Sequence, residues 1–222
     1  MVLAVDGKTL RGARASADAA PHLMACLDHA SGVVHAQIAV DGKTTEISMF
    51  SGLLDQVTGL DGVVITADAL HAQREHAAYL HGRGAYYLVT VKGNQPGLLR
   101  QLRSLPWKDV PPGHACEGRA HGRAGKRIVK AVTVTAGLLF PHAAQAIQVT
   151  RRTRRLSRRK WRAETSYAIT SLPAAQAAPA QLAEWIRGHW KIENQLHWVR
   201  SPGAGLAVAS CGAGATRVSF SC

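Results

Sequence analysis

The order of its strand and helix patterns constrains the fold of this chain more than any other feature of its sequence. Three strand-like segments come first, and strands and helices then alternate. The continuous apolar runs at residues 2–5 and 63–67 are typical of strands buried on both faces, whereas residues 33–40 alternate as a half-buried strand does. Three strands followed by βα units predict a mixed sheet with helices on both faces.

The expected elements up to residue 105 follow one order. We expect strands at 2–5, 22–28, 33–40, 63–67 and 86–91, and helices at 45–54, 72–81 and 95–105. Residues 28–32 join two of these strands as a hairpin loop, in which Gly32 can take a positive φ. The order β-β-β-α-β-α-β-α is that of the ribonuclease H-like fold.

The rest of the chain divides by composition. Residues 1–105 are expected to form the first part of the core. Residues 106–173 carry strand patterns at 128–135, 146–149 and 166–170, separated by glycine-rich or basic stretches, and predict a β-rich basic insertion. Residues 174–200 supply the last core helix. Residues 201–222 are rich in small residues and contain no carboxylate, which predicts a disordered or weakly attached tail.

The positive charge is unevenly placed. Residues 1–110 contain ten Lys/Arg and ten Asp/Glu, so the whole net charge of +13 lies in residues 111–222. A region with this excess of positive charge is suited to binding a polyanion, because neutralising phosphates releases their condensed counterions. The alternative is a basic segment that helps only solubility.

Several protein classes are disfavoured. No apolar run approaches the roughly 20 residues of a membrane helix, and the N-terminal residues do not resemble a secretory signal. The four cysteines are scattered without a Cys-x-x-Cys pair, which indicates a reducing cytoplasm rather than a disulfide framework or zinc site. We therefore expect a cytoplasmic protein with no membrane partner.

Three acidic residues are candidates for metal binding. Asp6 and Asp68 each end an apolar strand pattern, and Glu193 lies in an aromatic-rich helical segment. Taken singly, each aspartate is explained by a turn or capping role. Together they can meet, because the first and fourth strands can be neighbours in this sheet and ligand sites gather at strand C-termini. Carboxylate oxygens suit Mg²⁺ or Mn²⁺, and two such ions can activate an attacking oxygen and stabilise a leaving one.

Four sequence blocks carry a family resemblance. They read VDGKTLRG from Val5, TADALH from Thr66, VKGNQP from Val91 and GHWKIENQLHWVR from Gly188. In this order they resemble the catalytic domain of bacterial insertion-sequence transposases of the H-repeat-associated (ISAs-type) group. The resemblance implies that Asp6, Asp68 and Glu193 form an Asp-Asp-Glu triad. It also implies cleavage of double-stranded DNA at the transposon ends, transfer of the freed strand to target DNA, and a homo-oligomer at work at the bacterial nucleoid.

Basic and histidine side chains near these features are expected to contact DNA. Lysine and arginine clusters hold phosphate irrespective of sequence. The expected contacts are Lys8, Lys92, Arg151, Arg152, Arg154, Arg155, Arg158, Arg159, Lys160, His189 and His197. Two alternatives stay open: Lys92 as an ordinary exposed strand-end lysine, and the two histidines as structural residues.

Two departures from the family pattern suggest a shortened chain. Family members carry a region before the first catalytic strand, and their last helix continues where Ser201, Pro202 and Gly203 break it here. We therefore expect a remnant truncated at both ends, with a frameshifted tail, which sequencing of the flanking DNA would test. Two rival functions remain: a ribonuclease H-like nuclease without strand transfer, and a non-catalytic basic DNA-binding protein.

Overall fold

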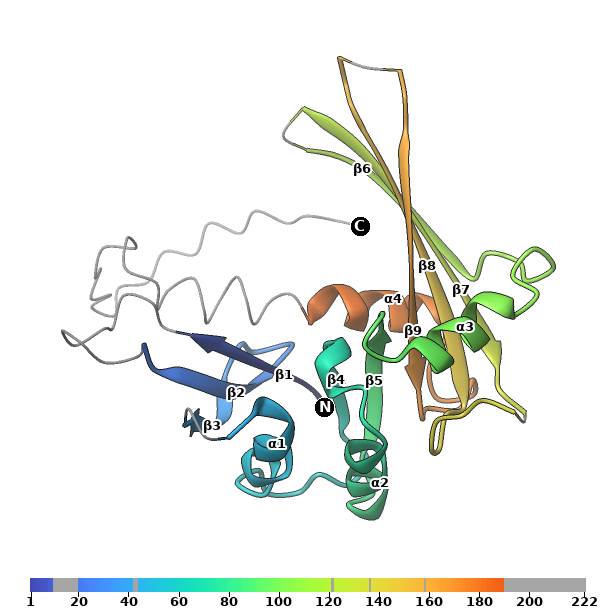
Figure 1. Cartoon of the computed structure of the whole chain (residues 1–222). Helices are drawn as coiled ribbons and strands as arrows, with labels where there is room; N and C mark the ends of the chain where they lie inside the picture. The colour runs from blue at the N-terminus through green and yellow to red at the C-terminus, as the bar shows by residue number, and fades with distance from the viewer. Residues whose placement is uncertain (10–19, 42–43, 121, 136, 158, 190–222) are drawn as a thin grey trace.

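A single mixed sheet organises the molecule. The computed structural model describes residues 1–9, 20–41, 44–120, 122–135, 137–157 and 159–189. The described residues form a nine-stranded sheet in the order β3-β2-β1-β4-β5-β9-β8-β7-β6 (Figure 1). Its strands are β1 (Val2–Thr9), β2 (His22–Asp28), β3 (Val34–Val40), β4 (Val64–Ala67), β5 (Tyr86–Val91), β6 (His114–Ala120), β7 (Arg123–Thr133), β8 (Gln145–Arg155) and β9 (Arg162–Thr170).

The first five strands have the topology of the ribonuclease H-like fold. Strand β1 pairs in parallel with β4, and β4 pairs in parallel with β5. Strand β2 is antiparallel to both of its neighbours. The predicted adjacency of the first and fourth strands is therefore confirmed, as is the positive φ of Gly32, which is 73°.

Strands β6 to β9 extend the same sheet. Strand β9 pairs antiparallel with β5, with Leu88 opposite Thr170. The sequence analysis missed β6 and placed residues 151–155 in a basic stretch between strands, whereas they lie in β8. These residues pair with β7 and β9, although a run of charged residues is not typical of a strand. Figure 1 shows the two hairpins, β6–β7 and β8–β9, rising above the rest of the molecule.

Helices cover both faces of the sheet. The helices are α1 (Glu46–Leu54), α2 (Arg74–Gly82), α3 (Pro96–Ser104), α4 (Pro179–Gly188) and the short 3₁₀ helix η1 (Ala69–His71). Thr45 caps the N-terminus of α1, because its side chain accepts a hydrogen bond from the backbone N–H of Ser48. No helix in the described ranges is long and apolar enough to span a membrane.

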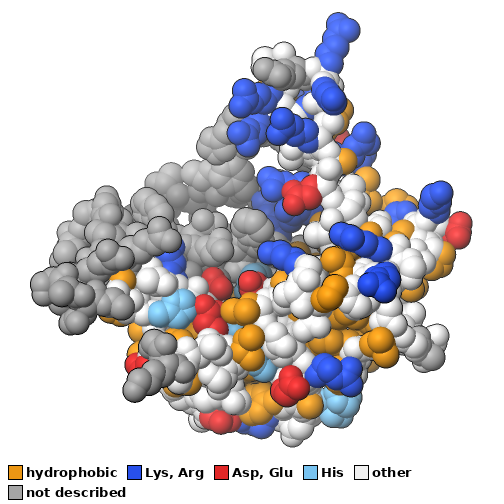
Figure 2. All heavy atoms as spheres, in the orientation of Figure 1, with side chains coloured by type: hydrophobic (Ala, Val, Ile, Leu, Met, Phe, Trp, Pro, Cys, Tyr) orange, Lys and Arg blue, Asp and Glu red, His pale blue; other side chains and the backbone are white. Residues whose placement is uncertain are grey.

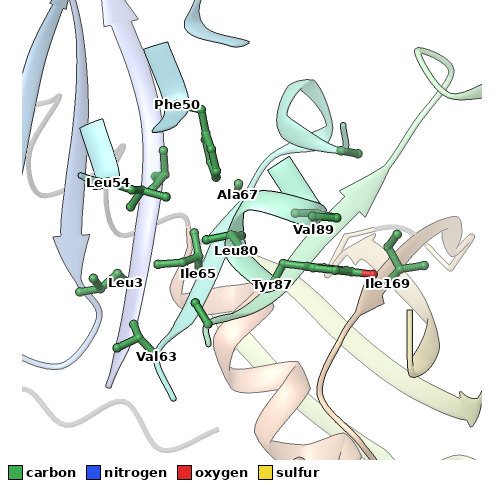
Figure 3. Packing of buried hydrophobic residues seen from close by; sticks show 14 of the residues in the cluster. Leu3, Phe50, Leu54, Val63, Ile65, Ala67, Leu80, Tyr87, Val89 and Ile169 are labelled. Carbon is green, nitrogen blue, oxygen red and sulfur yellow. The ribbon is translucent and has the colours of Figure 1, made fainter. Parts of the chain in front are cut away.

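Two core clusters identify the faces. One contains α1, α2 and α3 residues packed on Leu3, Ile65 and Tyr87 (Figure 3). The other contains Leu182 and Ala183 of α4 packed on the opposite side chains of the central strands. Because successive strand residues point to opposite faces, each strand residue can be assigned to the α1–α3 face or to the α4 face.

Candidate active site

Two of the three predicted acids lie where the parallel pairing of β1 with β4 stops. Asp68 follows the end of β4, whereas β1 continues past Asp6 to Thr9, beyond the predicted strand end at residue 5. Val5 of β1 pairs with Ala67 of β4, so Asp6 and Asp68 each lie one residue beyond the last paired position of the two parallel strands. Leu3 and Val5 belong to the core of the α1–α3 face, so alternation assigns Asp6 to the α4 face. Ile65 and Ala67 lie in the same core, and Asp68 follows them in extended backbone with φ −75° and ψ −175°. Both carboxylates are thus expected to serve the face covered by α4.

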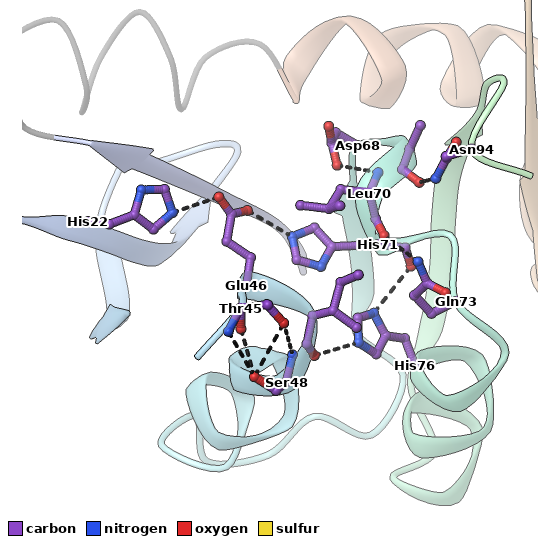
Figure 4. Close-up of polar contacts among 12 residues, drawn as sticks. His22, Thr45, Glu46, Ser48, Asp68, Leu70, His71, Gln73, His76 and Asn94 are labelled. Atoms are coloured by element: carbon purple, nitrogen blue, oxygen red, sulfur yellow. Dashed lines mark hydrogen bonds and ion pairs between the residues drawn. The ribbon is translucent and has the colours of Figure 1, made fainter. Parts of the chain in front are cut away.

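Asp68 also stabilises the turn that follows it. Its Oδ1 accepts a hydrogen bond of 2.8 Å from the backbone N–H of Leu70, which caps η1 (Figure 4). The capping role expected for a lone aspartate is therefore present. In Figure 4 the carboxylate points toward α4.

The turn after Asp68 is held from the end of β5. The Asn94 side-chain amide donates to the Ala69 carbonyl at 2.5 Å, and the Gln95 amide donates to the Ala72 carbonyl at 2.9 Å. These residues belong to the VKGNQP block, for which the sequence analysis proposed a role only at Lys92. The VKGNQP block therefore stabilises the turn that follows Asp68.

His189 connects the end of α4 to β4, close to the two acids. Its Nδ1 lies 3.2 Å from Thr66 Oγ1, which is also 2.8 Å from His29 Nε2. Burial lowers the pKa of His189, while the carboxylates of Asp6 and Asp68 act to raise it. The carboxylates of both acids therefore lie close enough to affect the pKa of His189, which is four positions before Glu193.

The predicted lysines lie on the same side of the fold. Lys92 is exposed just after β5, and its charge lowers the pKa of His189. Lys8 follows Asp6 by two residues on β1, so alternation assigns it to the same face. The positions of Glu193, His197 and Arg158 lie outside the described residues.

The available donors suit a hard divalent cation. Asp6 and Asp68 offer carboxylate oxygens, which Mg²⁺ and Mn²⁺ prefer. Within the described ranges no three His, Cys, Asp or Glu side chains gather into a metal site.

One carboxylate and two histidines, of which His71 is buried, form a cluster near this site that the sequence analysis missed. Glu46 Oε1 lies 2.6 Å from His22 Nε2, and Glu46 Oε2 lies 3.6 Å from His71 Nε2 (Figure 4). The imidazoles of His71 and His22 lower the pKa of the Glu46 carboxyl, His71 contributing most. Spacing could not reveal this cluster, because its members come from β2, α1 and η1.

Arginines line the α4 face of β7 and β8. Ile147 and Val149 pack in the α4-side core, so alternation assigns Arg151 and Arg155 to that face. Arg127 is opposite Arg151, and Arg123 is opposite Arg155. The charges of Arg151 and of Arg187 on α4 lower the pKa of Arg127, although burial lowers it most. Like charges directly opposite each other are destabilising, which favours an anionic partner.

The other face of the same hairpins has its own partners. Arg152 and Arg154 lie over the ring of Trp161, at 5.9 and 5.3 Å from its centroid. Lys126, which is opposite Arg152, forms an ion pair of 2.7 Å with Glu117. Arg159 and Lys160 are exposed beyond the end of β8. Figure 2 shows the lysine and arginine side chains gathered along the projecting hairpins.

Comparisons with known proteins agree on one family. The family model described as "Transposase DDE domain" matches residues 1–211. The chain is 31% identical to the "Putative protein YbfL" of Escherichia coli (strain K12) and 30% identical to that organism's "H repeat-associated putative transposase YhhI". Each alignment covers 89% of this chain and 55% of the relative, so the chain spans about half the length of these curated relatives.

A solved structure shares the fold. It is described as "Cryo-EM structure of piggyBac transposase synaptic complex with hairpin DNA (SNHP)". The match has a TM-score of 0.51 and 12% sequence identity, and it covers 89% of this chain and 40% of the other. At this identity the likeness concerns the fold alone.

Proposed function

Since the chain belongs to the transposase DDE domain family, we propose that its acidic site cleaves DNA strands and joins the freed ends to target DNA. Asp6, Asp68 and Glu193 are the proposed catalytic and metal-binding residues. The observation that carries this proposal is that Asp6 and Asp68 directly follow Val5 and Ala67, the last paired residues of two parallel strands. The position of His189 supports a third acid supplied by the segment that follows it: burial lowers the pKa of His189, and the carboxylates of Asp6 and Asp68 are close enough to oppose that shift.

The proposed cofactor is Mg²⁺ or Mn²⁺, bound as two ions by these carboxylates. Bound there, the ions lower the pKa of an attacking water or hydroxyl and stabilise charge on the leaving oxygen. The protein's own residues position this chemistry. Asp68 is oriented by its bond from Leu70, and the turn is fixed by Asn94 and Gln95.

The proposed substrate is double-stranded DNA, as transposon ends and as target. The opposed arginine pairs on the α4 face of β7 and β8 support this, because their mutual repulsion is relieved by phosphate. Lys8, Lys92 and His189 are the proposed contacts near the acids, and His197 is a further one. On the hairpins, Arg151, Arg152, Arg154, Arg155, Arg158, Arg159 and Lys160 are the proposed contacts.

The working form is proposed to be a homo-oligomer, since two transposon ends must be processed together. Its proposed place is the bacterial cytoplasm, associated with the nucleoid, where the DNA substrate lies.

Strand transfer distinguishes this function from simple hydrolysis. The full chain, incubated with Mn²⁺, a target plasmid and duplexes with pre-cleaved 3′ ends, is expected to join those ends to the plasmid. Joined products on a gel would support transposase chemistry. Nicked plasmid without joined ends would favour a nuclease, and DNA binding with neither product would favour a non-catalytic DNA-binding protein.

A further inference from the structure

Glu46 lies between the two segments that carry the catalytic aspartates. It is the first residue of α1, where a carboxylate is favoured by the helix dipole. Its carboxylate contacts His22 of β2 at 2.6 Å and approaches His71 of η1 to 3.6 Å. His22 Nδ1 in turn lies 2.8 Å from Thr9 Oγ1 on β1. One side chain therefore links the β1–β2 pair to the Asp68 turn.

The residue after Asp6 leaves room for this carboxylate. A Cβ atom built on Gly7 would overlap the Glu46 carboxyl group, so no larger residue fits there without displacing it. Gly7 does not have a positive φ, and the glycine is needed for close approach rather than for an unusual backbone conformation. The DG pair of the first sequence block thus combines an acid with the space for Glu46.

The burial of His71 explains why the approach of Glu46 is expected to stabilise the structure. Its side chain is fully buried, and neither ring nitrogen has a hydrogen-bond partner in the part of the chain that the structure describes. The rings of Phe50 and His76 pack beside it at centroid distances of 5.1 and 5.5 Å. A buried polar ring of this kind is costly without compensation, and Glu46 is the carboxylate that approaches it.

We propose that Glu46 is a positioning residue, which sets the distance between the Asp6 and Asp68 carboxylates through its contacts with His22 and His71. This inference rests on the proposed function, since it assigns a support to the same site. We assign Glu46 no metal-binding role, because its carboxylate lies against Gly7, on the face of β1 opposite to the one that Asp6 faces. Glu46 lies on the α1–α3 face of the sheet, whereas the Asp6 and Asp68 carboxylates are assigned to the α4 face.

Hydrogen exchange and metal dependence test this role in the full chain. Glu46→Ala is expected to speed amide exchange at residues 69–72 by about tenfold, because the turn loses its tie to β1 and β2. The same variant is expected to need more Mn²⁺ for half-maximal plasmid nicking, because the two acids are no longer held at the right separation. Gly7→Ala should have the same two effects, since it displaces the carboxylate while keeping Glu46.

Two further variants test the role of the Glu46 charge and provide a control. Glu46→Gln keeps an oxygen for His22 but loses the charge facing His71, so an intermediate effect is expected, and this variant decides the matter should Glu46→Ala not fold. Glu75→Ala, which removes an exposed acid from the first turn of α2, should leave exchange at residues 69–72 and the Mn²⁺ requirement unchanged.

Normal exchange at residues 69–72 in the folded Glu46 variants would overturn the proposal, and so would faster exchange with an unaltered Mn²⁺ requirement. A wild-type chain that does not nick DNA would instead count against the proposed function. In that case the exchange measurement alone decides whether Glu46 holds the turn.

Discussion

Close approach at two glycines shapes the surroundings of the acidic residues. Gly7 admits the Glu46 carboxylate on one face of the sheet, and Gly188 admits His29 on the other. A Cβ on Gly188 would lie 2.5 Å from His29 Nδ1, and the His29 ring contacts Thr66 of β4. The end of α4 therefore depends on the absence of a side chain at this position.

Replacing Gly188 tests this packing. Gly188→Ala is expected to destabilise the fold by about 1–3 kcal/mol, because the added methyl group forces the His29 ring or α4 to move. Gly52→Ala is the matched control in α1, where a Cβ would meet nothing within 4 Å. That change should be neutral or stabilise by up to about 1 kcal/mol. Equal effects of the two variants in urea unfolding would contradict the packing argument.

At the residue scale, the sequence is informative where the pattern is short-range. Asp6 and Asp68 could be named as candidates because each ends an apolar run, and their role stays a prediction. Glu46 and His71 could not be recognised, since their proximity depends on how α1 and η1 pack.

Among the elements, β8 has two halves that differ in their surroundings. Its first half packs in the core through Ile147 and Val149, and its second half carries arginines on both faces. The sequence could not predict this continuation, because alternation of apolar and polar residues ends where the arginines begin. Pairing with β7 along the whole strand extends β8 beyond that point.

The two faces of β8 are expected to bind DNA unequally. Arg151→Ala should lower the slope of log affinity against log salt concentration by about 1, because one phosphate contact is lost. Arg152→Ala removes the same charge from the opposite face, where Arg152 already lies over Trp161. A smaller effect is therefore expected, measured by fluorescence anisotropy with duplex DNA at several salt concentrations. The reverse order would place DNA on the face away from α4.

Across the whole molecule, the order of the first eight elements was sufficient to predict the ribonuclease H-like core. The extension of the sheet was not predictable, because the pairing of Leu88 with Thr170 joins positions far apart in the sequence. The division into a core at residues 1–105 and 174–200 and an insertion at 106–173 stays a proposal. The predicted tail at 201–222 lies outside the described residues.

The proposed function requires that the basic hairpins hold DNA and that the acids cut it. Asp68→Asn separates the two activities, since an asparagine oxygen can still accept from Leu70 and keep the turn. Asp61→Asn is the control, because Asp61 is an exposed acid near the opposite end of the same strand.

The most direct measurement is Mn²⁺-dependent nicking of supercoiled plasmid by the full chain, with DNA affinity determined on the same preparations. Asp6→Asn, Asp68→Asn and Glu193→Gln are each expected to reduce nicking to background while DNA affinity and melting temperature stay those of the wild type, and Asp61→Asn should nick normally. Undiminished nicking in the Asp68→Asn protein would contradict the assignment of the active site.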